Sequence, residues 1–178
     1  PFFFIIGCVA IFASILLLKF SQNIKASYLK PRLIDIIHTL KLRHNLYIFL
    51  MIFGIFFTFQ AMLNFIPFEL ARIDENYNSS KAGMLYIGYL IGVLVAFNTK
   101  KITALFRSPI TAIIAGIITL IIAIQIFRIE SFGLIFVAMV VFCLGNFIAH
   151  SIASGFVNKM ATTHKGISNG LYVSFYYF

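Results

Sequence analysis

The sequence predicts an all-α integral membrane protein, a helical bundle with about six transmembrane helices. Hydrophobic residues make up 61% of the 178 residues, charged residues only 11%, and the mean hydropathy is +1.00. A soluble domain carries about 45–50% apolar and about 25% charged residues. The apolar residues also form long runs without the alternation of strands, and a helix needs about 20 such residues to cross a bilayer. Helices suit lipid because each satisfies its own backbone hydrogen bonds.

The first expected span covers residues 2–18 and stays uncharged until Lys19. A secretory signal peptide would begin with basic residues and end at a small-residue cleavage site. This segment lacks the basic start, and the sequence opens with Pro1 rather than Met. We therefore expect an internal transmembrane helix that is cut at its beginning.

Five further spans are expected. The fourth begins at Ser108-Pro109, where a capping residue precedes a proline suited to the first helical turn. The sixth breaks off at Phe178, so a longer polypeptide is expected. Their ranges are 46–68, 82–98, 109–127, 132–157 and 168–178.

Charge placement predicts the orientation of these spans. Eleven of the 14 basic residues fall in alternate connections on one side, and four of the five acids fall on the other. The positive-inside rule makes the basic side cytoplasmic. The net charge of +9 is therefore explained by membrane-protein loops, and no nucleic-acid partner is expected.

The cytoplasmic segment 19–45 allows two interpretations. Leu33, Ile36, Ile37 and Leu40 recur at helical spacing among basic residues. This pattern is typical of an amphipathic helix at the membrane surface. A solvated linker whose charges only fix the topology fits equally well, and both interpretations stay open.

Small residues predict helix-packing faces. Gly88, Gly92 and Ala96 recur every four residues on the third span, and Ala112 and Gly116 repeat the spacing on the fourth. Side chains of this size let helix backbones approach closely in a membrane.

Polar residues at membrane depth are the candidates for function. Such groups are costly against lipid, so they should face the bundle interior or a water-filled cavity. Hydrogen bonds between helices are the structural alternative, and for Gln60 and Asn64 the two readings stay even. The candidates for lining a substrate cavity are Gln60, Asn64, Asn146, His150, Ser151, Ser154, Asn169, Tyr172 and Tyr176.

His150 is the titratable group well inside a span that could change charge near neutral pH. A proton relay and a hydrogen-bonded packing role are both open for it. No Asp or Glu lies in the middle of a span, so an acidic coupling residue is expected only in sequence beyond this chain.

Enzymatic signatures are absent from the sequence. It contains no G-x-x-x-x-G-K-[ST], G-x-G-x-x-G, H-E-x-x-H or G-x-S-x-G motif. Cys8 and Cys143 are too few and too distant for a zinc site. We expect no catalytic residue, no metal and no cofactor.

Two stretches resemble a known family. Ala149-His150-Ser151-Ile152-Ala153-Ser154 in the fifth span matches an A-H-S-x-A-S run, and residues 165–177 carry the lysine and tyrosines that follow it. These runs resemble the tenth and eleventh helices of major facilitator superfamily transporters, in particular the bacterial inner-membrane efflux branch related to drug:proton antiporters. Residues 64–68 are similar to the end of the seventh helix in that branch.

The resemblance implies an architecture. Residues 1–18 would be helix six of a twelve-helix transporter, 19–45 the cytoplasmic central linker, and 46–178 a truncated C-terminal half with helices seven to eleven. Lys100, Lys101 and Arg107 would belong to a cytoplasmic gating loop, although the family's Asp and Gly are missing there. The N-terminal half of the same polypeptide would be the missing partner.

The resemblance also implies a function. It predicts secondary active transport of small molecules by alternating access in the bacterial inner membrane, with proton-coupled efflux favoured. The partners would be the lipid bilayer, a small-molecule substrate and protons. An uncoupled or importing facilitator is the close alternative. A membrane enzyme or assembly factor is the distant one, and it would have to use His38, His44 and His164.

Overall fold

The computed structural model describes residues 2–21, 30–161 and 164–178, and every regular element in these ranges is a helix. The chain divides into two units, Pro1–Lys30 and Pro31–Phe178. Five helices among the described residues are long and apolar enough to cross a membrane. The chain is therefore an all-α integral membrane helical bundle, as the sequence predicts.

The first unit contains α1, Phe2–Phe20. Its described side chains from Phe3 onward are exposed, including Phe12 and Leu17. Helix α1 therefore presents apolar side chains in every direction, which suits a segment surrounded by lipid. The part of the expected linker at 22–29 lies outside the described residues.

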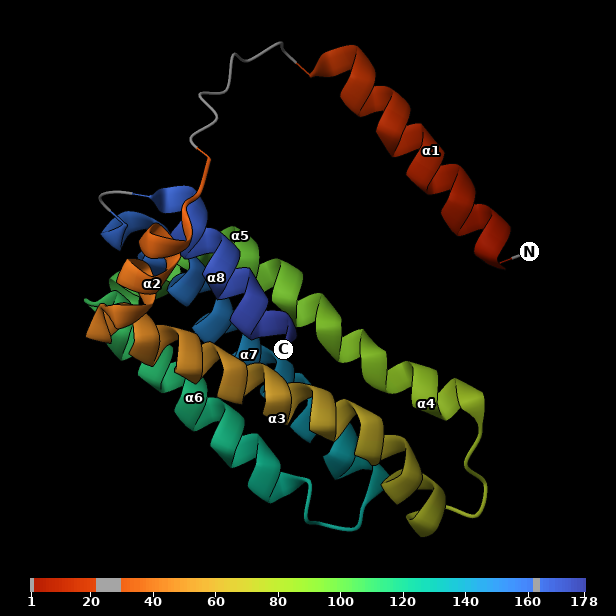
Figure 1. Ribbon diagram of the computed structural model, residues 1–178. Helices are drawn as coiled ribbons and strands as arrows, with labels where there is room; N and C mark the ends of the chain where they lie inside the picture. The colour runs from red at the N-terminus through yellow and green to blue at the C-terminus, as the bar shows by residue number, and fades with distance from the viewer. Residues whose placement is uncertain (1, 22–29, 162–163) are drawn as a thin grey trace. The chain divides into compact units, whose positions relative to one another are not determined.

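The second unit is built around α7, which contacts α3, α5, α6 and α8 (Figure 1). Helices α4 and α5 follow one another through the short 3₁₀ turn η1, and α2 packs on α3 and α8. The elements are α2 (Leu33–Lys41), α3 (Arg43–Ile73), α4 (Ser79–Leu85), η1 (Tyr86–Tyr89), α5 (Leu90–Leu105), α6 (Pro109–Ile126), α7 (Phe132–Met160) and α8 (Lys165–Tyr177).

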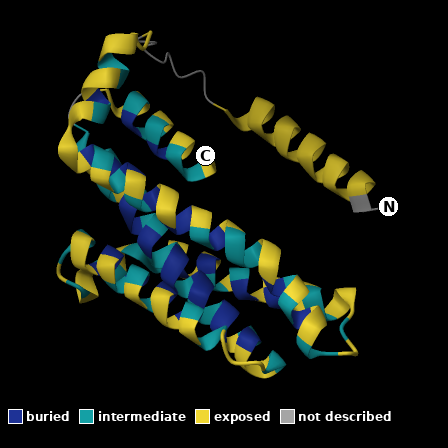
Figure 2. Ribbon diagram, turned by 60° about the horizontal axis from the view of Figure 1, so that its bottom comes forward, coloured by how far each residue is buried: buried dark blue, intermediate teal, exposed yellow. Residues whose placement is uncertain are grey.

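The core of this unit lies where α7 meets its neighbours. Phe49 and Ile52 on α3 and Phe142 on α7 are fully buried, while the outward faces are exposed (Figure 2). Phe59 stacks on Phe142, with ring centroids 5.2 Å apart. Lipid is as apolar as these side chains, so close packing rather than apolar burial favours this association.

Glycines set the closest crossing, between α6 and α7. A Cβ on Gly145 would lie 2.6 Å from the Gly116 carbonyl oxygen, and one on Gly116 would lie 2.8 Å from the Gly145 carbonyl oxygen. Gly92 on α5 leaves room for the Phe147 ring, which a Cβ there would meet at 2.6 Å. These contacts place α5 and α6 against different faces of α7.

Several helices extend beyond the ranges that hydropathy predicts. Helix α3 continues past Pro67 to Ile73, and α5 continues through Lys100 and Lys101 to Leu105. Helix α7 ends at Met160, and α8 begins at Lys165, three residues before the expected start of the sixth span. Hydropathy detects only the apolar part of a helix, about 20 residues that cross the lipid. The helix itself continues beyond that part, because its backbone hydrogen bonds also form outside the lipid.

The segment before α3 forms the amphipathic helix α2. Thr39 is buried and Leu40 packs against the core, whereas Leu33, Ile34 and Ile37 are exposed. The buried Asn45 amide donates to the Thr39 carbonyl oxygen at 3.2 Å, which ties α2 to the start of α3. Part of the apolar face of α2 therefore covers the bundle and part remains outside.

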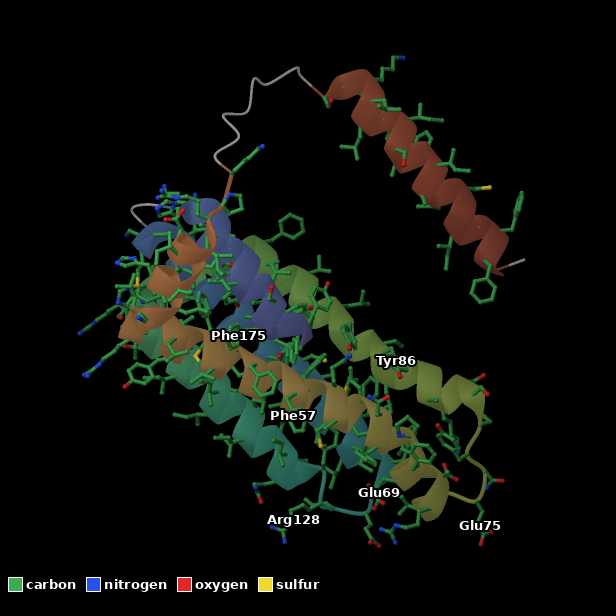
Figure 3. The ribbon with its side chains drawn as sticks, in the orientation of Figure 1. Phe57, Glu69, Glu75, Tyr86, Arg128 and Phe175 are labelled. Carbon is green, nitrogen blue, oxygen red and sulfur yellow. The ribbon has the colours of Figure 1, made fainter. Side chains whose placement is uncertain are left out.

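The two ends of the bundle differ in charge. Figure 3 shows Glu69, Glu75 and Arg128 at one end, the acidic end. There Arg72 on α3 bonds both Glu69 and, at 2.5 Å, Glu130 in the turn before α7. The pKa of Asp74 is held below its ordinary value because its carboxylate accepts a hydrogen bond from Lys81.

The opposite end, the basic end, carries Lys100, Lys101, Arg107, Lys159 and Lys165 at the α5–α6 and α7–α8 connections. Its described residues include one carboxylate, that of Asp35 on α2.

Candidate functional site

A histidine–tyrosine pair joins α7, one of the candidate membrane-spanning helices, to α8. His150 Nδ1 lies 3.0 Å from the Tyr172 hydroxyl oxygen, and the same hydroxyl donates to the His150 carbonyl oxygen at 3.1 Å. Tyr172 is buried, with 3% of its surface exposed. Two contacts to one residue fix the relative position of the two side chains more tightly than a single hydrogen bond does.

Aromatic rings enclose the His150 imidazole. Phe56 from α3 meets it edge-on at 5.0 Å between centroids, and Tyr176 from α8 stacks on it at 5.1 Å. Tyr172 stacks at 5.8 Å, and Phe56 also contacts Tyr176. The site therefore combines three helices, with α7 supplying the imidazole and α3 and α8 supplying its apolar walls.

Asn146 lies one turn before His150 and on the same face of α7, since residues four apart on a helix are neighbours. Its side chain is fully buried. Neither the nitrogen nor the oxygen of its amide has a hydrogen-bond partner among the described residues. Such groups cost about 1–3 kcal/mol each in a protein interior, so Asn146 calls for a functional explanation.

A second polar contact between α7 and α8 lies closer to the basic end. The Asn169 amide donates to Asn158 Oδ1 at 2.6 Å. Asn158 was not among the sequence candidates, although it continues the spacing of four that relates Asn146, His150 and Ser154. Extending that row by one turn would have found it.

The other α7 candidates are half-buried. Ser151 and Ser154 are partly exposed, and the Ser154 carbonyl oxygen accepts a hydrogen bond from the Asn158 amide at 3.2 Å. Four candidates therefore come together at the α7–α8 contact, whereas Asn146, Ser151 and Ser154 lie at other positions along α7. The four are His150, Asn169, Tyr172 and Tyr176.

Gln60 and Asn64 occupy a different surface. Both are exposed on α3, and the Asn64 amide donates to the Gln60 carbonyl oxygen at 2.8 Å. Phe57, one turn earlier, points outward from α3 in Figure 3 and is 67% exposed. The structure thus places these two amides on an exposed, largely apolar face of α3, and neither amide is hydrogen-bonded to His150.

The remaining candidates fall at helix contacts and ends. Gly88 lies against Met139 and Gly92 against Phe147, whereas Ala96 is exposed. Lys100 and Lys101 lie on α5 rather than in a loop, which corrects that part of the gating-loop expectation. Arg107, in the turn before α6, adopts a left-handed backbone with φ of 60°.

His38, His44 and His164 do not form a metal-binding cluster among the described residues. His38 on α2 and His44 on α3 are exposed, and His164 lies 3.9 Å from Asp35. Among the described residues no group of three or more His, Cys, Asp or Glu side chains could hold a metal ion. The chemistry available at the α7–α8 site is hydrogen bonding and proton exchange at an imidazole, against aromatic walls.

The fold and this site define a multi-pass membrane protein with a polar, aromatic contact between helices. A protein of Buchnera aphidicola subsp. Schizaphis graminum (strain Sg), named an uncharacterized transporter, is 30% identical over 98% of this chain and 43% of its own length. Another of that name, from Buchnera aphidicola subsp. Baizongia pistaciae (strain Bp), is 25% identical over 67% of this chain and 30% of its own length.

The chain thus spans less than half the length of these relatives. No protein-family model matches it, and no solved structure matches it.

Proposed function

We propose that this chain is part of a secondary active transporter that moves a small molecule across the membrane by alternating access, coupled to protons and in the direction of efflux. The observation that carries the proposal is the His150 cluster. A titratable imidazole and two tyrosines lie where α7 and α8 meet, and one turn earlier on α7 is an amide without a partner among the described residues. Ionisable groups at membrane depth mark substrate or proton pathways.

Membership of the major facilitator superfamily is part of this proposal. The A-H-S-x-A-S run and the tyrosines that carry the resemblance are the residues that build the cluster. In this arrangement α1 corresponds to helix six, residues 19–45 to the cytoplasmic linker, and α3 to α8 to helices seven to eleven. The remaining length of the relatives would then hold the N-terminal half, which lines the other side of the substrate cavity.

Flux measurements test the proposal. The full-length polypeptide that contains this chain is reconstituted in proteoliposomes, a pH gradient is imposed, and the movement of a panel of fluorescent amphiphiles is followed. We expect each amphiphile to move opposite to the flow of protons down the gradient, and this movement should stop when the gradient is collapsed. Movement that ignores the gradient would indicate an uncoupled facilitator, and no movement of any amphiphile would contradict proton-coupled efflux of this class.

Histidine variants assign the site. Replacing His150→Ala should abolish gradient-driven flux, because it removes the imidazole between α7 and α8. His38→Ala is the matched control, since His38 is exposed on α2 and makes none of the contacts of the His150 cluster. Full coupling in the His150 variant would exclude this residue from the proton pathway.

A further inference from the structure

Tyr172 has a single hydroxyl proton and two neighbours that could receive it, both belonging to His150. The carbonyl oxygen lies 3.1 Å from the hydroxyl oxygen, and Nδ1 lies 3.0 Å from it. A backbone carbonyl only accepts, whereas Nδ1 of a neutral imidazole either accepts or donates. The position of the imidazole proton therefore depends on where the hydroxyl proton goes.

Only one assignment fills both contacts. If the hydroxyl donates to the carbonyl oxygen, Nδ1 carries its own proton and donates it to the hydroxyl oxygen. If instead the hydroxyl donated to Nδ1, two oxygen atoms with lone pairs would face each other at 3.1 Å with no proton between them. The hydrogen bonds made by the ring nitrogens decide which of the two nitrogens of a neutral imidazole carries the proton.

The other ring nitrogen is then left with a lone pair. In the Nδ1–H tautomer, Nε2 is an acceptor, and it has no hydrogen-bond partner among the described residues. The groups facing the ring are Phe56 from α3 and Tyr172 and Tyr176 from α8. Of these only the two tyrosines titrate, and no charged side chain from the described residues contacts the ring.

We propose that Tyr172 is a positioning residue that holds His150 in the Nδ1–H tautomer. Nε2 then keeps a lone pair, which accepts either the coupled proton or a hydrogen bond from an O–H or N–H group of the transported molecule. The role of Nε2 in transport rests on the proposed function, whereas the tautomer does not. Asn146, one turn earlier, supports a polar ligand at this place because its buried amide also lacks a partner.

Nitrogen NMR tests the tautomer directly. The full-length polypeptide is labelled with [15N]histidine in lipid nanodiscs, and the His150 signals are identified by difference from a His150→Gln variant. We expect a protonated Nδ1 and an unprotonated Nε2 near neutral pH. On acidification the new proton should appear at Nε2 while Nδ1 stays protonated. A parent protein with protonated Nε2 and bare Nδ1 would overturn the proposal.

Two tyrosine variants separate positioning from packing. Tyr172→Phe keeps the ring and removes the hydroxyl, so the Nδ1–H tautomer should lose its dominance. Tyr176→Phe removes a hydroxyl that makes no hydrogen bond to His150, so the tautomer should not change. A Tyr172→Phe spectrum identical to that of the parent would refute the positioning role.

Because these spectra require no flux, a failed transport assay would contradict the proposed function and leave the tautomer assignment standing.

Discussion

Amide side chains in this bundle fall into two kinds. The Asn45 amide donates to the Thr39 carbonyl oxygen, and the half-buried Asn158 and Asn169 bond each other across α7 and α8. Asn146 is more deeply buried than these three residues, yet both of its polar atoms lack a partner in the described part of the chain. An amide that stabilised the fold would be paired, so Asn146 is better explained by binding than by stability.

The Asn146→Leu variant should therefore separate stability from transport. Leucine has a similar shape and leaves no unsatisfied polar atom, so we expect the thermal stability in detergent to stay equal or to rise. Any gain would come from removing two unpaired polar atoms, each of which costs about 1–3 kcal/mol when buried. Transport by the full-length protein should fall. A clear loss of stability would show that Asn146 has a structural partner instead.

Replacing glycine by alanine on α7 should affect stability differently at Gly145 and at Gly155. Gly145→Ala would place a methyl group 2.6 Å from the Gly116 carbonyl oxygen and from the Leu120 nitrogen, so the α6–α7 crossing must open. We expect destabilisation of about 1–3 kcal/mol, the usual cost of overpacking. Gly155→Ala on the same helix meets no atom within 4 Å. It should be neutral or stabilising by about 0.5–1 kcal/mol, the helix preference of Ala over Gly.

Thermal unfolding of both variants in detergent measures this difference. Equal stability of the two would show that the α6–α7 crossing does not depend on the missing side chain at Gly145.

Among the elements, α2 depends on one carboxylate for its first turn. Asp35 accepts hydrogen bonds from the Arg32 guanidinium and backbone N–H, and the guanidinium holds the pKa of Asp35 below its ordinary value of 3.8. Because the pKa of Asp35 is lower in the folded helix than in the unfolded chain, ionised Asp35 stabilises the helix fully at pH values above its unfolded-state pKa. That stabilisation is lost as the pH falls through the pKa that Asp35 has in the folded helix.

Acid should therefore loosen α2. A spin label at exposed Ile37 should become more mobile as the pH falls below 3.8, the ordinary Asp pKa, and through the lower pKa of Asp35 in the folded helix. Asp35→Asn should cause the same mobility at neutral pH. A label at Ile118 on α6 serves as the control, because it is exposed and remote from α2. Mobility at Ile37 that is independent of pH in the parent protein would contradict this role of Asp35.

Hydropathy and charge predict the helices of this protein well, because lipid imposes the same demand on every span. The ranges 109–127 and 132–157 agree with α6 and α7 to within three residues at each end. The third span is less well predicted. Lys100 and Lys101 lower the hydropathy at its end, yet α5 continues through them, since long basic side chains reach water from the last turns of a helix.

The contacts within the candidate site are harder to predict from the sequence than the helices are. Spacing along α7 predicts that Asn146, His150 and Ser154 share a face, but not that Tyr172 bonds His150 twice, since that contact depends on how α8 packs. Spacing also grouped Gln60 and Asn64 with the cavity residues, whereas the structure has them on an exposed face of α3. Whether that face lines a cavity remains a prediction about the full-length transporter.

For the whole molecule, the unequal ends imply an orientation in the membrane. The Arg72 bonds to Glu69 and Glu130 confirm that the α3 terminus and the α6–α7 turn share the acidic end. Lysines and arginines gather at the opposite end, around the α5–α6 and α7–α8 connections. The positive-inside rule then predicts that the basic end is cytoplasmic.

Labelling of single cysteines tests this orientation. In a Cys8→Ser, Cys143→Ala background, Asn76→Cys marks the acidic end and Lys101→Cys the basic end, and both positions are exposed. In intact bacterial cells that produce the full-length protein, a membrane-impermeant maleimide should label position 76 and leave position 101 unlabelled. Permeabilising the cells should make position 101 reactive. The reverse pattern would place the basic end outside, and labelling of both in intact cells would mean that the chain inserts in two orientations, as weakly biased charges allow.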